Sequence, residues 1–182
     1  MMTTLKWFAF AVAGISVALA ADGARKVYPV PDKTSLELSV PTAWKDEVRE
    51  GDRGMPPTIV FAPREGQTFQ VLVTPIWRPR PDVPVPTAEQ IRDSVQRVAD
   101  QMKTQAVEKE LPVVEFKGAT GPGYYFSATD KAPAPNEFKY LTQGMLLVGE
   151  LAVTFSILTN DGQEKVRDDA LAMLKAATQT RL

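Results

Sequence analysis

The stretch FKYLTQGMLLVGELAVTFSIL, residues 138–158, decides the fold of this chain. Two runs of strand-forming residues, Phe138–Val148 and Leu151–Leu158, flank Val148-Gly149-Glu150. In the second run, large apolar residues alternate with small or polar ones, which is typical of a strand with one buried face. The large residues are Leu151, Val153, Phe155 and Ile157, and the opposite face carries Ala152, Thr154, Ser156 and Leu158. We therefore predict a long antiparallel hairpin whose second face is small, mixed and partly covered.

Five more strands are predicted upstream, from short runs rich in β-branched and aromatic residues. They are Ser35–Val40, Thr58–Ala62, Phe69–Thr74, Val113–Lys117 and Tyr124–Thr129. The loop Pro63–Gln67 has the length and the glycine of a hairpin connection. Gly118–Gly123 is glycine-rich, but an aromatic strand follows it instead of a helix. We interpret it as a turn and not as a phosphate-binding loop. The charged segment Lys45–Arg53 is expected to be a solvated excursion.

Two amphipathic helices are predicted. Thr87 and Gln90 have the spacing of a capping box. Apolar residues then recur on one helical stripe at Ile91, Val95, Val98, Met102 and Ala106. The proline-rich segment Pro75–Pro86 cannot enter a helix interior, so we interpret it as an extended connector from sheet to helix. The second helix is expected to have Asp161 as its N-cap and Glu164 at N3. Its buried stripe is formed by Val166, Ala170, Met173, Leu174 and Ala177.

The predicted order is β-β-β-α-β-β-β-β-α. Strands joined by short turns pair antiparallel, and both helices must bury their apolar stripes on the sheet. The fold class is therefore α+β, with a mostly antiparallel sheet of about seven strands packed with two amphipathic helices. A closed barrel is the alternative, but a helix of about five turns between the third and fourth strands argues against it.

The composition excludes several kinds of chemistry. The chain has 182 residues, a formal net charge of −1, and neither cysteine nor histidine. Thiol nucleophiles, disulfides, Ser-His-Asp triads and metal sites built on cysteine or histidine are therefore excluded. There is no basic excess to bind nucleic acid. We expect a protein that is not an enzyme, with no cofactor and no metal site.

The N-terminus has the pattern of a bacterial secretory signal peptide. Lys6 precedes the uncharged run Trp7–Ala20, which ends in Ala18-Leu19-Ala20, an A-x-A cleavage signature. Cleavage before Ala21 would leave a single mature domain, residues 21–182, with an ordered core over about 35–178. The apolar run is shorter than the ~20 residues of a transmembrane helix, so no stable membrane span is expected after cleavage. An uncleaved anchor is the alternative. The expected location is the periplasm, with secretion as the second choice.

Aromatic and basic residues provide a candidate recognition rim. Tyr124 and Tyr125 are adjacent on a predicted strand, so their side chains must point to opposite faces. The outward one, with Trp77, Arg78 and Arg80 of the connector, would form a protein-binding rim. Core packing is the alternative explanation for these aromatic residues.

Two other kinds of site remain open. A small apolar ligand could be held between sheet and helices, in an adaptable cavity lined by Met102, Met145 and Met173. For carboxylate or tyrosine chemistry, the candidate residues are Glu115, Asp130 and Tyr125. We assign them no catalytic roles, because the distances between them in the fold decide whether they could act together.

The chain resembles the PsbP-like superfamily, which includes DcrB-like exported bacterial proteins of unknown function. The resemblance covers about residues 35–178. It rests on Val40-Pro41-Thr42-Ala43-Trp44, Phe69-Gln70-Val71-Leu72-Val73 and the helix that follows, Gly123-Tyr124-Tyr125, and the final hairpin with its C-terminal helix. The resemblance implies an α/β/α sandwich and a non-catalytic accessory role that binds other proteins at or near membranes. DcrB-like members are typically lipoproteins, and this chain has no lipid-accepting cysteine. The expected partner is therefore another envelope protein, with no nucleic acid.

Export gives the first test. The segment Trp7–Ala20 should direct secretion and be cleaved before Ala21, and Ala13→Arg should block export. A charge in the apolar run costs about 2.5–3.5 kcal/mol on the insertion scale. N-terminal sequencing of the envelope-soluble protein is the measurement. A protein that begins at Met1, or that is found only in the cytoplasm, would contradict the expectation.

Overall fold

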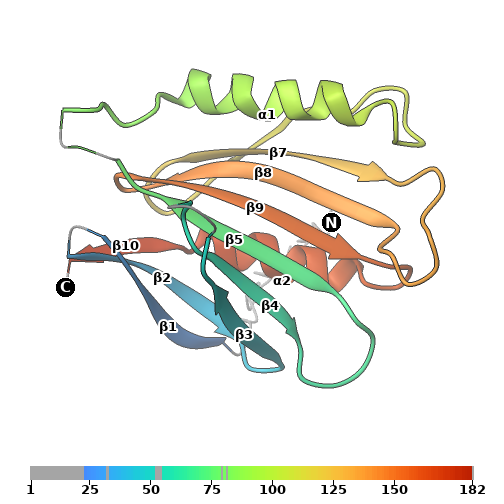
Figure 1. Cartoon of the computed structure of the whole chain (residues 1–182), viewed down its shortest axis with the longest axis horizontal. Coiled ribbons are helices and arrows are strands. Elements are labelled where there is room, and N and C mark those ends of the chain that lie inside the picture. The colour runs from blue at the N-terminus through green and yellow to red at the C-terminus, as the bar shows by residue number, and fades with distance from the viewer. Residues whose placement is uncertain (1–22, 32, 52–54, 79, 81, 182) are drawn as a thin grey trace, which may run out of the picture.

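The computed structural model describes residues 23–31, 33–51, 55–78, 80 and 82–181, and shows ten strands and two helices in this part of the chain (Figure 1). In chain order these elements are β1 Gly23–Val30, β2 Thr34–Pro41, β3 Trp44–Arg49, β4 Thr58–Pro63, β5 Gln70–Ile76, α1 Ala88–Met102, β6 Val114–Lys117, β7 Pro122–Thr129, β8 Tyr140–Val148, β9 Leu151–Thr159, α2 Glu164–Lys175 and β10 Thr178–Arg181. The predicted signal segment, residues 1–20, lies outside the described residues. No helix among the described residues is long and apolar enough to cross a membrane.

The strands form two antiparallel sheets. The large sheet has seven strands in the order β3-β4-β5-β9-β8-β7-β6, and the small sheet has three in the order β1-β2-β10. The final hairpin, β8 and β9, is paired along its whole length from Tyr140↔Thr159 to Val148↔Leu151. An α+β fold with a seven-stranded antiparallel sheet and two helices is thus confirmed.

The two faces of the large sheet are covered differently (Figure 1). On one face, α2 and the small sheet enclose the larger core, in which Phe61, Phe155 and Leu174 are almost fully buried. The predicted buried face of β9 lies here. On the other face, α1 covers β7 and β8 with a second core around Ile91 and Phe126. The two helices therefore pack on opposite faces of one sheet.

Of the two predicted helix caps, the one at α1 is confirmed and the one at α2 is wrong. The capping box at α1 is confirmed: Thr87 accepts a hydrogen bond from the Gln90 backbone, and the Gln90 side chain accepts one from the Thr87 backbone. The capping box predicted for the second helix is wrong. Gln163 is the N-cap of α2, without a side-chain cap hydrogen bond. Asp161 instead accepts hydrogen bonds from Lys139 and Tyr140, which compete for its carboxylate.

Two strand predictions and one helix prediction need correction. Ser35–Val40 forms β2, but in the small sheet, where β1 and β10 flank it. Neither flanking strand was predicted: β1 lies before the predicted ordered core of about 35–178, and β10 begins at its last residue and extends beyond it. The segment Lys45–Arg53 is not wholly a solvated excursion, because Trp44–Arg49 forms β3 at the edge of the large sheet. Its charges are those of an edge strand, where Lys and Glu protect the unpaired backbone. Finally, α1 ends at Met102, and Ala106 forms an isolated bridge with Asp130.

A cluster of polar side chains joins the two sheets where β1 passes β3. Asp46 accepts a hydrogen bond from Tyr28 at 2.9 Å and pairs with Lys26. Burial raises the pKa of Asp46, but the hydrogen bonds from Lys26 and Tyr28 outweigh it and leave the pKa below its ordinary value. Burial and the bond to Asp46 raise the pKa of Tyr28. The carboxylate of Asp46 is therefore held in its charged form between the sheets.

This cluster should make stability depend on pH. Asp46→Asn is expected to lower the free energy of unfolding at pH 7 by about 1.5–3 kcal/mol, the range for a hydrogen bond to a charged group. A carboxyl group with a lowered folded pKa stabilises the fold above its unfolded value, here 3.8, and this contribution is lost as the pH falls through the folded pKa. Urea unfolding at pH 7 and pH 3 should therefore show a difference between wild type and variant that shrinks in acid.

The matched control is Asp93→Asn, on the exposed side of α1. It should change stability little at either pH. A difference between wild type and Asp46→Asn that is equal at pH 7 and pH 3 would contradict the role given to this carboxylate.

Candidate binding site between the two sheets

A pocket of about 650 Å³ opens where the ends of the two sheets meet. Its walls come from four places: the turn between β1 and β2, the connector after β5, the tip of the β8–β9 hairpin, and β10. These segments lie side by side at one end of the molecule, on the left of Figure 1. The lining residues are Pro31, Lys33, Thr34, Trp77, Arg78, Arg80, Glu150, Leu151, Gln179, Thr180 and Arg181.

Three of the predicted rim residues line this pocket. Trp77 is half-buried against the larger core, at the point where β5 ends and the connector begins. Arg78 donates to Glu150 at 2.7 Å and to the backbone oxygen of Val83 at 3.5 Å. The backbone of Val83 also donates to the oxygen of Arg80 at 3.1 Å. The connector therefore contains a turn and is tied to the β8–β9 hairpin, so the prediction of an extended segment from Pro75 to Pro86 is wrong at this turn.

The floor of the pocket is a relay of hydrogen bonds centred on Gln179 of β10. Its Oε1 accepts from the backbone N–H of Glu150 at 2.6 Å, and its Nε2 donates to Thr34 Oγ1 at 2.9 Å. Thr34 then donates to the backbone oxygen of Thr180 at 3.0 Å. One side chain therefore connects the large-sheet hairpin with two strands of the small sheet, and the floor is fixed before any ligand binds.

Gly149 permits this contact. Its φ is +61°, a backbone conformation that side chains rarely adopt, and a Cβ at this position would lie 2.3 Å from Gln179 Oε1. A side chain at this position would have to displace the Gln179 side chain, so its absence favours the hydrogen-bonded approach of the hairpin tip to β10.

The charge around the pocket is mainly positive. Four basic residues and one acidic residue, Glu150, line it. The whole chain has 21 basic and 22 acidic residues, so this excess is local. Arg78 neutralises Glu150, and Arg80 lies 3.3 Å from Asp82, with both side chains more than 70% exposed. Among the described residues, neither Lys33 nor Arg181 has an ion-pair partner.

Lys33 has an unusual backbone. Its φ is +54°, and Asn136 is the only other non-glycine residue with a positive φ among those described. Glycine or asparagine normally takes such a hairpin position, and a longer side chain there costs about 1–3 kcal/mol. In this turn conformation, Lys33 is exposed and its side chain lines the pocket.

The two tyrosines of the predicted rim lie elsewhere. Their side chains point to opposite faces of β7, as predicted. Tyr124 is buried with the core under α1, and Tyr125 packs against the larger core and the ring of Phe116. Both faces of the sheet are covered at this strand, so neither ring joins Trp77. The rim that the structure brings together contains Trp77, Arg78 and Arg80 only.

The structure does not bring together the proposed catalytic set. Glu115 is paired with Tyr124, so it shares that residue's face of the sheet, whereas Tyr125 points to the other face. Asp130 lies beyond the far end of β7, where it bridges Ala106. These three groups cannot act on one substrate. Among the described residues, no group of three or more carboxylates is placed to hold a metal ion.

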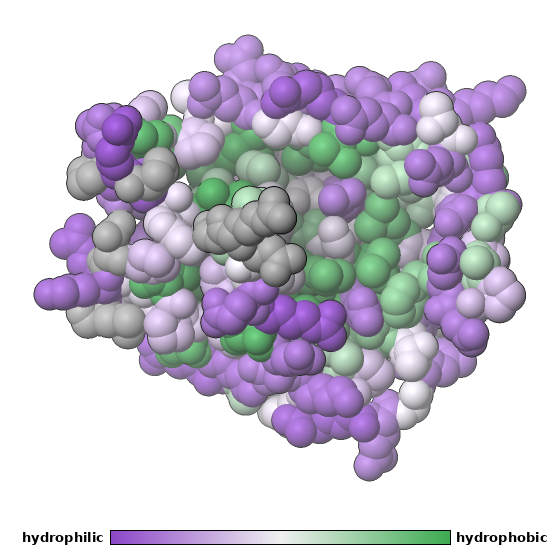
Figure 2. Space-filling view, in the orientation of Figure 1, coloured by the Kyte–Doolittle hydropathy of each residue, from purple (hydrophilic) through white to green (hydrophobic). Residues whose placement is uncertain are grey.

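A second, more open groove runs beside α1. It has a volume of about 860 Å³ and includes Ile76, Pro86, Ile91, Met145 and Ala152 in its lining. Figure 2 shows apolar side chains gathered in a hollow below the polar outer side of α1. The small, mixed face of β9 lies here, as predicted.

The methionines proposed to line one cavity do not share one. Met145 lines the α1 groove, and Met102 lines a separate small hollow near the end of α1. Met173 is buried in the core on the opposite face of the sheet.

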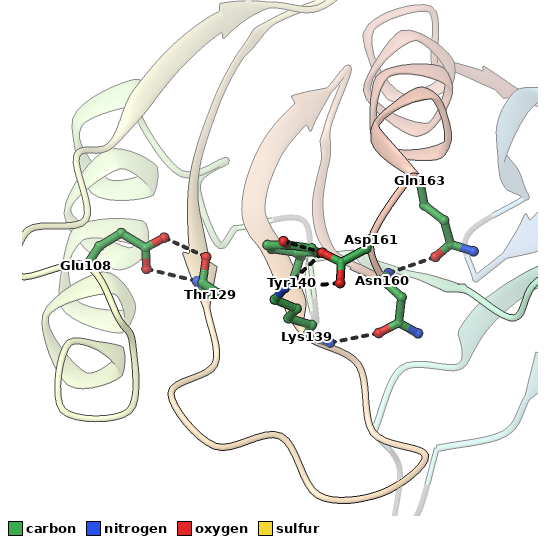
Figure 3. A network of polar contacts seen from close by, with 7 residues as sticks. All are labelled: Glu108, Thr129, Lys139, Tyr140, Asn160, Asp161 and Gln163. Atoms are coloured by element: carbon green, nitrogen blue, oxygen red, sulfur yellow. Dashed lines mark hydrogen bonds and ion pairs between the residues drawn. The ribbon is translucent and has the colours of Figure 1, made fainter.

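At the opposite end of the molecule, polar side chains connect the loops to the ends of β7 and β8 by hydrogen bonds (Figure 3). Both oxygens of Glu108 accept from Thr129, from its backbone at 2.9 Å and from its hydroxyl at 2.7 Å. Burial raises the pKa of Glu108, but these bonds outweigh it and hold the pKa below its ordinary value. Tyr140 donates to Asp161 at 2.6 Å. No buried side-chain polar atom of the described residues lacks a partner, so we assign this network a structural role.

The sequence indicated only part of the pocket. Trp77 and the arginines stood out because aromatic and basic residues occur together on a proline-rich connector. Lys33, Gln179 and Arg181 gave no signal, because they become neighbours of Trp77 only when β10 pairs with β2. The positive φ of Lys33 cannot be read from its residue type.

Comparison with solved structures shows the same fold in two proteins. The solution structure of cyanobacterial PsbP (CyanoP) from Synechocystis sp. PCC 6803 matches with a TM-score of 0.54 and 11% identity, over 91% of this chain and 97% of that one. The crystal structure of LpqN, involved in cell envelope biogenesis of Mycobacterium tuberculosis, matches with a TM-score of 0.51 and 12% identity, over 87% of this chain and 93% of that one. No protein-family model matches the chain, and no curated protein matches it either. The fold is therefore PsbP-like, as the sequence predicted.

The pocket floor can be tested by Gln179→Met, which keeps the length of the side chain and removes its polar atoms. The free energy of unfolding is expected to fall by about 1–3 kcal/mol, because the Glu150 N–H loses its acceptor and Thr34 loses a donor. Urea unfolding measures it. Gln101→Met, on the exposed side of α1, is the control. If both variants stay within about 0.5 kcal/mol of wild type, the range of ordinary surface changes, the relay does not join the sheets.

Proposed function

We propose that this chain is an exported accessory protein of the cell envelope, which binds another protein at the inter-sheet pocket and does no chemistry itself. The observation that carries the proposal is the pocket itself. Trp77, Arg78 and Arg80 line it, together with the hydrogen-bonded floor formed around Gln179. Tryptophan and arginine are the residue types that most often dominate binding energy at protein interfaces. The absence of histidine and cysteine from the sequence and the separation of the candidate catalytic groups support a non-catalytic role.

The location in the envelope has two supports. The N-terminal segment has the pattern of a cleaved export signal, with the periplasm as the destination. One protein of the same fold, LpqN, is involved in cell envelope biogenesis. Because fold does not determine function, the neighbour supports the class of role and not a particular partner.

A carrier of a small apolar ligand is the second candidate. The groove beside α1 favours it, since Ile91 and Met145 line a hollow whose size falls in the range of small-molecule sites. The groove is more open than the inter-sheet pocket and lies on the other face of the large sheet. The two proposals therefore predict binding at different places.

Site-specific photo-crosslinking separates them. A photoreactive residue at Arg80, which is exposed on the pocket rim, should give a discrete crosslinked protein in envelope preparations. The same residue at Lys109, exposed at the opposite end of the molecule, should not. Equal crosslinking from both positions would contradict binding at the pocket. A small-molecule mass retained in native mass spectrometry, with no crosslinked protein at Arg80, would favour the carrier.

A further inference from the structure

We infer that the inter-sheet pocket binds an extended acidic segment of the partner protein, with carboxylates against Lys33 and Arg181 and an apolar side chain against Trp77. This inference rests on the proposed function and deepens it by naming the chemistry of the partner. It follows from three features of the pocket: its sign of charge, the position of its charges, and its apolar wall.

The sign of charge favours an acidic ligand. The pocket's one acidic lining residue, Glu150, is already paired with Arg78 at 2.7 Å. Among the described residues, Lys33 and Arg181 remain without an ion-pair partner. A concave site with uncompensated charge of one sign concentrates ligands of the opposite sign. The site therefore selects for negative charge in a chain that is slightly acidic overall.

The position of the charges favours a segment with several carboxylates over a small free anion. A small anion is usually held by donors that converge inside a pocket and exclude water. Here Lys33, Arg80 and Arg181 are exposed, and they lie on three different segments around the mouth. Charges spread around a rim suit an extended ligand that offers one carboxylate to each, and they contribute mainly to steering and specificity.

The apolar wall gives such a segment an anchor. Trp77 packs against the larger core, so its ring is held in place, and Leu151 and Pro31 line the same pocket. A half-buried tryptophan beside a cavity is the common form of an interface anchor. The expected segment therefore combines acidic residues with at least one large apolar residue.

The strained turn supports a binding role for Lys33. Glycine at this position would relieve the positive φ of +54°. Lys33→Gly should thus keep or raise the melting temperature while it weakens binding. If Lys33 served only to form the turn, replacing it by glycine would leave binding unchanged.

The test uses the mature protein and two fluorescein-labelled peptides of alternating residues, Glu-Leu and Gln-Leu. Fluorescence anisotropy should show binding of the Glu-Leu peptide that weakens with added salt, and at least tenfold weaker binding of the Gln-Leu peptide. The double variant Lys33→Gln with Arg181→Gln should lower the affinity for the Glu-Leu peptide at least tenfold. The control Arg92→Gln with Lys109→Gln removes the same charge from exposed sites elsewhere and should change it less than twofold.

Several outcomes would overturn the inference. Equal binding of the two peptides would show that carboxylates are not recognised, and equal losses in both double variants would show only a long-range charge effect. Complete displacement of the Glu-Leu peptide by an equal concentration of inorganic phosphate would identify a free anion as the ligand. If Arg80 crosslinks a protein but the peptides bind equally, the acidic segment is wrong and the proposed function stands. If Arg80 gives no specific crosslink, the proposed function itself fails.

Discussion

The pairing of β10 with β2 is the constraint on which the rest of the structure depends. It joins residues near the two ends of the described chain, since Thr34 donates to the backbone of Thr180, 146 residues away. Without β10, β2 would be paired with β1 alone, and a two-stranded ribbon is only marginally stable in water. With β10 in place, the small sheet has three strands and an apolar side that includes Leu36 and Leu38, both fully buried. This side and α2 cover one face of the large sheet.

The same pairing creates the candidate binding site. The strand β10 carries Gln179 to the tip of the β8–β9 hairpin, where Gly149 leaves room for it. Arg181 then stands at the mouth of the pocket, opposite the connector that carries Trp77. The site is therefore built from the ends of elements rather than from their middles, and its floor is also a structural joint. Such an arrangement gives a hydrogen-bonded base with exposed side chains around it.

Local patterns predicted most of the large sheet and little of the small one. Six of the seven strands in the large sheet were predicted, because each is a short run of alternating, β-branched or aromatic residues bounded by turn residues or prolines. The missed strands have weaker signals. In β3 the charged residues Lys45, Glu47 and Arg49 hide the period, and β10 is a four-residue polar run, TQTR, that becomes a strand only through tertiary pairing. The candidate site was found in part for the same reason: three of its residues are neighbours in sequence, whereas Lys33 and Gln179 are brought to them by the fold.

The separation between β2 and β10 also affects when the protein can fold. The strand β2 is synthesised long before β10, so the small sheet cannot be completed while the ribosome is still adding the residues between them. Long-range β pairing is slow, because the intervening loop must be closed before the contacts form. The large sheet and α1 can form earlier, but one face of the sheet then remains uncovered and apolar. The chain therefore stays incompletely folded until β10 has been synthesised and can pair with β2.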